Sequence, residues 1–261
     1  VDYYKKLFQT MGNIIDLIEK DNMPKYLLFL ENAFPYMDNY NYHKGMNGII
    51  QELTGLLKTK NIGTDSDRAL LLDFQATLEI KPEKAIKLEK DALAQIENIT
   101  ADNARLVSNL HANLGGLYRM NGHPDLAREH MEKSISLLDQ FNLLHINDSI
   151  PQIANYAMFL TEQQEPERGI SELQKLSGII KEYHSDDCLD YAKVQETLGT
   201  IYLMTANLPQ AKTHFKRAFK IYEKIWADEP EMIEAKYQEI QELYPQIGFC
   251  IGKNLSGLLT K

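Results

Sequence analysis

Cysteine is scarce in this chain of 261 residues, which contains only Cys188 and Cys250. The two lie 62 residues apart, and neither has a metal-ligating neighbour at a useful spacing. A disulfide framework and a zinc-binding module are therefore disfavoured. We expect two reduced thiols, as is usual in cytoplasmic proteins, and no bound metal.

Long hydrophobic runs are also missing, since the longest apolar stretches are far shorter than the roughly 18 residues of a membrane span. The net charge of −9 argues against a polyanionic ligand, because phosphate binding needs clustered lysine and arginine. We therefore expect neither a membrane nor a nucleic-acid partner. No signal peptide is visible, which predicts a cytoplasmic protein. Because the chain begins with Val1 rather than Met, it can be a fragment of a longer protein.

Charge of one sign does not gather in any segment. Lysine and glutamate are mixed in residues 81–84 and 87–90. Such runs are typical of solvated helix faces rather than of docking patches. We therefore expect the charged side chains of these segments, Glu89 included, to face solvent.

Catalytic motifs are missing as well. The His-Glu-x-x-His signature of zinc proteases is absent, and Gly115-Gly116 falls inside a predicted helix rather than in a phosphate-binding loop. No serine or cysteine nucleophile has a strand-turn-helix setting. His130 and His214 each precede an inward-facing residue, so we expect them at a helix flank, outside any site. We expect no catalytic residue, no cofactor and no enzyme activity.

What the chain does have is a repeat of 42 residues. Four segments share a frame in which a small residue closely follows a proline. The small residues are Ala85, Ala127, Gly169 and Ala211, and the residues aligned thirteen positions earlier are Leu72, Leu114, Tyr156 and Leu198. A fixed period of this length is the signature of a solenoid of stacked helical units.

Each unit is predicted to be a pair of antiparallel helices. In the clearest unit, the residues at helical spacing on one face are Leu110, Leu114, Leu117 and Tyr118. Pro124 then starts a second helix, because its missing N–H costs nothing in a first turn. The small side chains of Ala127 and Ala211 let two backbones approach, so both should be buried at a helix crossing. Stacking of neighbouring units supplies the core that no unit can form alone.

The pattern resembles the tetratricopeptide repeat, in the 42-residue variant of kinesin light chains and of many bacterial regulatory proteins. The matching residues are Leu114-Gly115, Tyr118, Ala127 and Met131 in one unit and Leu198-Gly199, Tyr202, Ala211, Phe215 and Ala218 in another. The resemblance implies an all-α fold, a right-handed α-solenoid of antiparallel helix pairs. About four clear and six total units are expected, with about twelve helices.

The whole chain, residues 1–261, is expected to form one elongated superhelical domain of three parts. These are divergent N-terminal helices over 1–65, clear 42-residue repeats over 66–225, and a divergent repeat or cap over 226–261. Residues 1–20 are expected to form an amphipathic helix.

The first clear repeat departs from the pattern. Asp73 replaces the glycine of the Leu-Gly pair, and Ala76 replaces the tyrosine. Its start is still marked, because Thr64 and Asp67 have the spacing of a capping box at a helix N-terminus.

In arrays that resemble this one, the first helix of each unit lines a concave groove that holds a peptide. The candidate groove residues are Asn109, Asn113, Arg119, Asn155, Lys193, Glu196 and Thr200, and the same helical stripes include Thr161 and Leu203. Asn113 and Asn155 lie one period apart, and an asparagine amide can both donate to and accept from a peptide backbone. Arg119 or Lys193 could hold a carboxylate. Alternatively, the two asparagines only cap or cross-link neighbouring helices.

Two functions remain open. The first is a non-catalytic scaffold or sensor that binds a peptide segment of a protein partner, as part of a larger regulatory protein. The second is a peptide-pheromone receptor domain of a Gram-positive quorum-sensing regulator, which needs a DNA-binding or effector part that this chain does not show. The abundance of Lys, Ile, Asn and Tyr is typical of an AT-rich bacterial genome. The partner's identity and a homo-oligomeric state are left open.

Overall fold

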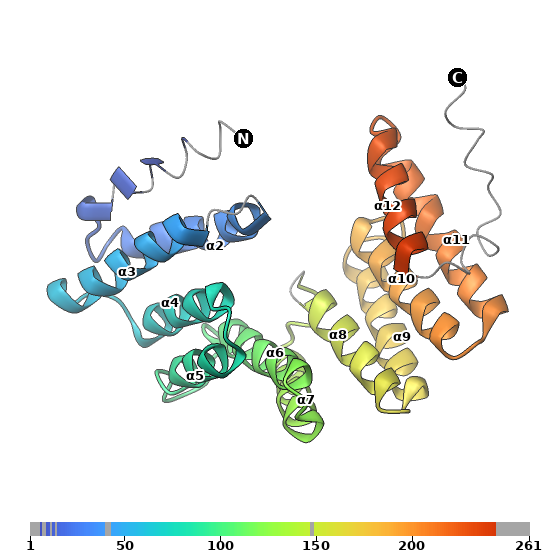
Figure 1. Cartoon of the computed structure of the whole chain (residues 1–261), viewed down its shortest axis with the longest axis horizontal. Helices are drawn as coiled ribbons and strands as arrows, with labels where there is room; N and C mark the ends of the chain where they lie inside the picture. Colours follow the sequence, from blue (N-terminus) through green and yellow to red (C-terminus); the bar gives the residue numbers. More distant parts are fainter. Residues whose placement is uncertain are drawn as a thin grey trace. The chain divides into compact units, whose positions relative to one another are not determined.

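The computed structural model describes residues 6, 9–10, 12–13, 15–39, 43–146 and 149–243. Within these residues the protein is all-helical, with eleven α-helices, one short 3₁₀ helix and no strand (Figure 1). In chain order they are η1 (Ile15–Leu17), α2 (Met23–Asn39), α3 (His43–Lys60), α4 (Asp65–Leu78), α5 (Pro82–Leu93), α6 (Ala104–Met120), α7 (Pro124–Gln140), α8 (Ser149–Glu162), α9 (Pro166–Tyr183), α10 (Leu189–Met204), α11 (Leu208–Ile225) and α12 (Pro230–Leu243).

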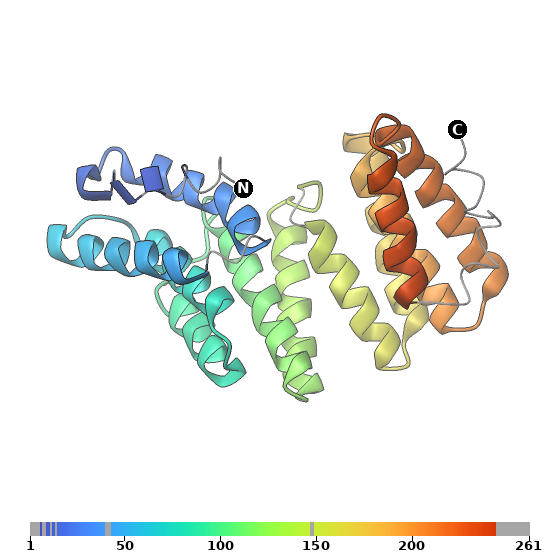
Figure 2. The same ribbon diagram turned by 45° about the horizontal axis from the view of Figure 1, so that its top comes forward.

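The chain forms two compact units, Val1–Leu137 and Leu138–Lys261. The first contains η1, α2 to α6 and most of α7, and the second contains α8 to α12. Within each unit, consecutive helices lie side by side and neighbouring pairs stack (Figure 1 and Figure 2). Both units therefore have the α-solenoid architecture that the repeat predicts.

The core of the first unit is shared between successive helix pairs. Leu30 of α2 is fully buried, and Phe34 of the same helix stacks on Phe74 of α4 with ring centroids 4.7 Å apart. A second cluster joins α4, α5 and α6 through Ala69, Ala92 and Leu110. Each pair thus buries its apolar stripe against the next, as a repeat stack requires.

The second unit is held by close packing of α10, α11 and α12. A Cβ atom added at Gly199 of α10 would lie only 2.9 Å from the ring of Phe215 on α11. Phe219 of α11 stacks on Tyr237 of α12 with ring centroids 4.0 Å apart. The absence of a side chain at Gly199 therefore gives Phe215 its place in the core.

The predicted helix crossings are confirmed. Ala127 and Ala211 are both 0% exposed. A Cβ atom added at Gly115 of α6 would lie 3.3 Å from the carbonyl oxygen of Ala127 on α7. Small residues on both helices therefore permit the close approach.

The tight turns inside three successive pairs share one backbone geometry. Gly122, Gln164 and Ala206 lie one period apart and have φ angles of 75°, 66° and 59°. The residue after each donates its N–H to a carbonyl five residues earlier: His123 to Tyr118, Glu165 to Leu160 and Asn207 to Tyr202, at 2.7 to 2.9 Å. This left-handed cap satisfies carbonyls at the end of the first helix and leads directly into the second.

The predicted capping box is present at the start of α4. The backbone N–H of Asp67 donates to Oγ1 of Thr64 over 3.1 Å, and the backbone N–H of Thr64 donates to Oδ2 of Asp67 over 2.6 Å. Two N–H groups that the helix leaves unpaired are satisfied in this way.

The ends of the chain are described only in part. Of the amphipathic helix predicted over residues 1–20, Leu7, Met11 and Ile14 lie outside the described residues. Ile15 is buried, but it begins a 3₁₀ helix rather than lying in an α-helix. In the C-terminal cap predicted over 226–261, α12 is present and residues 244–261 lie outside the described part.

Candidate functional site

The candidate groove residues of the first unit lie on α6. Asn113 is exposed, whereas Asn109 and Arg119 are partly buried and make further contacts. The Asn113 side chain donates from Nδ2 to Oδ1 of Asp73 on α4 over 2.8 Å. Asn113 therefore links two neighbouring first helices, and an amide has more hydrogen-bonding capacity than this contact uses.

A pair of carboxyl groups lies next to Asn113. Asp73 of α4 and Glu89 of α5 are hydrogen-bonded to each other, and Asn113 is bonded to both. Glu89 is only 1% exposed, so the prediction that its segment faces solvent is wrong for this residue. Its position in the repeat frame, equivalent to Met131, is an inward one, which explains the burial.

Burial and mutual repulsion change the acidity of this pair. Burial raises the pKa of Glu89 far above its ordinary value, and the Asp73 charge raises it further. The pKa of Asp73 is also raised, chiefly by burial. Because two adjacent carboxylates cannot both ionise at little cost, the pair holds one proton at neutral pH.

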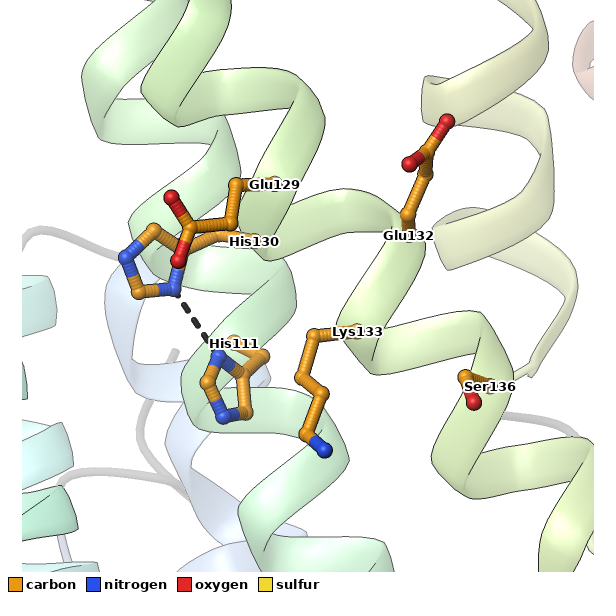
Figure 3. Close-up of a pocket in the computed structure, with 6 residues that line it drawn as sticks. All are labelled: His111, Glu129, His130, Glu132, Lys133 and Ser136. Atoms are coloured by element: carbon orange, nitrogen blue, oxygen red, sulfur yellow. Dashed lines mark hydrogen bonds between the residues drawn. The ribbon is translucent and has the colours of Figure 1, made fainter.

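Two histidines meet between α6 and α7. Figure 3 shows the hydrogen bond that joins Nδ1 of His111 to Nδ1 of His130 over 2.9 Å. The cavity of about 510 Å³ beside them is also lined by Glu129, Glu132, Lys133 and Ser136. Charges of both signs line this cavity, so it does not select a ligand of one charge.

The same arrangement recurs two periods later with only one histidine. His214 of α11 is bonded through Nδ1 to Oε1 of Gln195 on α10 over 2.9 Å. Tyr118 stacks on His130 and Tyr202 stacks on His214, with centroids 5.4 and 5.3 Å apart. Because a glutamine takes the place of His111, the contact serves helix packing and requires no imidazole chemistry. That both aligned histidines lie outside any functional site stays a prediction.

The equivalence with Gln195 leads to a prediction for His111→Gln. Burial, His130 and Lys133 lower the pKa of His111 to about 4, so its neutral form stabilises the fold above about pH 6.5. That contribution is lost as pH falls from about 6.5 toward about 4. The variant should keep the bond to His130 and lose less stability than wild type between about pH 7 and about pH 5. Urea unfolding at both pH values measures this, and equal losses in the two proteins would contradict it.

In the second unit, Lys193 and Glu196 of α10 both take part in ion pairs. Lys193 lies 3.7 Å from Asp190. Glu196 lies 3.0 Å from Nζ of Lys236 on α12 and accepts a hydrogen bond from the hydroxyl of Tyr222 over 2.6 Å. Glu196 therefore ties α10 to α11 and α12, with two partners that the sequence analysis did not select.

A cavity of about 270 Å³ lies beside this ion pair. Tyr222 of α11 and Trp226, which directly follows α11, form one wall with ring centroids 4.9 Å apart, and Met232 of α12 contributes another apolar surface. The side chains of Lys193 and Lys236 also line it. Its size and apolar walls suit one large apolar side chain.

The remaining candidate residues differ in exposure. Asn155 of α8 is exposed and Thr200 of α10 is partly buried. Thr161 and Leu203 are buried, with exposures of 7% and 8%, so their assignment to the groove stripe is wrong. The hydroxyl of Thr161 donates instead to the carbonyl of Ala157 over 2.9 Å. The exposed polar stripe is therefore narrower than predicted.

The described part of the chain contains neither a cluster of potential metal ligands nor a membrane-spanning helix. No group of three or more His, Cys, Asp or Glu side chains there is arranged to hold a metal ion. None of the described helices has the length and apolarity needed to cross a bilayer.

Comparison with known families identifies the repeat. Residues 149–224, which span α8 to nearly the end of α11, match the family model of the tetratricopeptide repeat. A comparison with curated protein sequences finds no match. The family match confirms, for residues 149–224, the resemblance to the tetratricopeptide repeat inferred from the repeat frame.

Solved structures share the fold at low sequence identity. One is a structure of kinesin light chain TPR-like repeats from Podosopora anserina. Its sequence is 12% identical to this one, the similarity covers 80% of this chain and 99% of that chain, and the TM-score is 0.62. BtubC (BKLC) from P. vanneervenii is 18% identical in sequence. The similarity covers 77% of this chain and 74% of that chain, with a TM-score of 0.52. A Rap protein complexed with Competence and Sporulation Factor is 13% identical in sequence. The similarity covers 96% of this chain and 77% of that chain, with a TM-score of 0.53. These similarities establish the solenoid fold and no function.

Proposed function

We propose that this chain, which carries tetratricopeptide repeats of the kinesin-light-chain type, is a cytoplasmic, non-catalytic interaction module that binds a peptide segment of a protein partner. Within each unit, the peptide lies against the first helices of the repeats: α6 in the first unit, and α8 and α10 in the second. The proposal belongs to the interaction class because the repeats supply a scaffold, and no catalytic constellation was found in the sequence.

One observation carries the proposal. Asn113 and Asn155 occupy the same position in successive repeats, and both are exposed on a first helix. Exposed asparagine is not needed to fill a core, and its amide can satisfy the N–H and C=O groups of an extended peptide. The bond from Asn113 to Asp73 supports a cross-linking role as well, so binding must be tested separately from folding.

The test uses a phage-displayed library of random dodecapeptides selected on the full chain. Losing a hydrogen-bonding partner in an interface costs about 1–3 kcal/mol, so Asn155→Ala should weaken a selected peptide about tenfold. Asn113→Ala should do the same in the first unit. Gln174→Ala, an exposed amide on the second helix α9, is the matched control and should bind like wild type.

Two results would overturn this function. One is failure of the folded chain to select any peptide. The other is equal binding by wild type and by both folded asparagine variants, which would move the interaction away from the first helices.

A receptor domain for a short secreted peptide is the second candidate. It is favoured by the extent of the similarity to the Rap protein solved with Competence and Sporulation Factor, which covers 96% of this chain. The two candidates differ in the ligand they need. A selected peptide that binds only with free ends supports the receptor, whereas equal binding when it is embedded in a longer protein supports the scaffold.

A further inference from the structure

We propose that Asp73 and Glu89 form an acidic subsite on the first unit, which takes one lysine or arginine side chain of the bound peptide. This inference rests on the proposed peptide binding and names a chemical feature of the ligand.

The repeat frame shows that the fold does not require this carboxyl pair. The positions of Asp73 and Glu89 are occupied in the three following repeats by Gly115 and Met131, Ala157 and Leu173, and Gly199 and Phe215. In two of them the large side chain packs directly over the glycine. The three following repeats therefore place a small residue opposite a large apolar residue at this helix crossing. The first repeat has two acidic residues at these positions instead.

One oxygen of this pair lacks a partner. Glu89 Oε2 is buried and has no hydrogen-bond partner among the described residues. Leaving a buried polar atom unpaired costs free energy. Glu89 reaches from α5 to Asp73 on α4, and Asp73 in turn meets Asn113 near the surface. A buried oxygen without a hydrogen-bond partner thus belongs to the same carboxyl pair as the half-buried Asp73, which contacts the exposed Asn113.

The surrounding charges leave the subsite acidic. Glu31 of α2 is close enough to raise the pKa of Asp73. Arg105 of α6 lies 2.8 Å from Glu31 and is paired with it. Three carboxyl groups, those of Glu31, Asp73 and Glu89, therefore lie close together, and Arg105 pairs with Glu31. Because this cluster lacks the arrangement of a metal site, a side-chain ammonium or guanidinium group is the cation that fits it.

Proton release follows from the same geometry. In the free protein the pair shares a proton, and an incoming cation favours the doubly ionised form. Binding of a basic peptide should therefore release a proton and tighten as pH rises from about 5 to about 8. Isothermal titration calorimetry in buffers of different ionisation enthalpy measures this release.

The experiment compares random dodecapeptides selected on wild type with those selected on Asp73→Ala/Glu89→Leu, which copies the Ala157 and Leu173 pair and should fold. Peptides selected on wild type should be enriched about tenfold in lysine or arginine at one position relative to those from the variant. The best basic peptide should release a proton on binding wild type and none on binding the variant.

The outcomes separate the two proposals. If wild type selects peptides without a basic preference, or if the variant keeps the same preference, the acidic subsite is overturned while peptide binding stands. If wild type selects no peptide, the proposed function and the subsite fall together.

Discussion

The double substitution Asp73→Ala/Glu89→Leu is expected to raise the free energy of unfolding at neutral pH by about 1–4 kcal/mol, taking as a guide the range seen when well-packed apolar residues replace a buried ion pair. Wild type buries Glu89 completely and Asp73 in part, and it leaves Glu89 Oε2 without a partner in the described structure. The variant installs the apolar pair that the third repeat already uses at Ala157 and Leu173, both 0% exposed. Urea unfolding followed by circular dichroism measures the change.

The pH dependence provides an internal control for this prediction. The folded-state pKa of each carboxyl group is raised above its unfolded value. The contribution of the pair to the free energy of unfolding is therefore fully present at low pH. It is lost as pH rises above the ordinary carboxyl range, from about pH 4.5 upward. The gain from the double variant should therefore grow between about pH 5 and about pH 8. Glu89→Gln retains a hydrogen-bond donor but cannot ionise. Its free energy of unfolding should also exceed that of wild type, by a smaller amount. A gain that does not change with pH would contradict the shared proton.

Gly169→Ala is expected to lower the free energy of unfolding by about 1–3 kcal/mol, because a single methyl group overpacks the crossing of α8 and α9. The added Cβ would lie 2.6 Å from the carbonyl oxygen of Ala157 and 3.2 Å from its Cα. These neighbours are backbone atoms, so relief requires one helix to move. The effect should outweigh the gain in helix propensity that alanine brings.

Gly178→Ala is the matched control, because it makes the same exchange in the same helix. A Cβ atom at Gly178 would have nothing within 4 Å, so alanine should raise the free energy of unfolding by about 0.5–1 kcal/mol. Chemical denaturation of both variants measures the contrast. If Gly169→Ala proved as stable as Gly178→Ala, the close helix crossing would be wrong.

Much of the fold could be predicted from the repeat alone. The fixed spacing of Ala127 and Ala211 placed both at helix crossings, because a helix pair can approach closely only where both side chains are small. The Thr64 capping box followed from spacing within four residues. Such features depend on local chemistry or on periodicity, and both are visible in a sequence.

The acidic pair was harder to predict because burial at a repeat position does not depend on the neighbouring residues in the chain. Glu89 lies among exposed lysines and was therefore assigned to solvent, although its frame position is that of Met131 and Phe215. The departure at Asp73 could have identified it. In the repeat frame the residue opposite Asp73 is Glu89, on the next helix, so an acid at one position points to its partner at the other. Lys236, the partner of Glu196 on α12, had no such signal, because its helix lies beyond the clear repeats.

Peptide binding on the first helices is the central claim, and backbone amide chemical shifts of the isotope-labelled chain test it most directly. Addition of a selected dodecapeptide should shift amides on α6 around Asn113 when the peptide binds the first unit, or amides on α8 and α10 around Asn155 when it binds the second. Shifts confined to the second helices α5, α7, α9 and α11, in a chain that remains folded, would contradict the account.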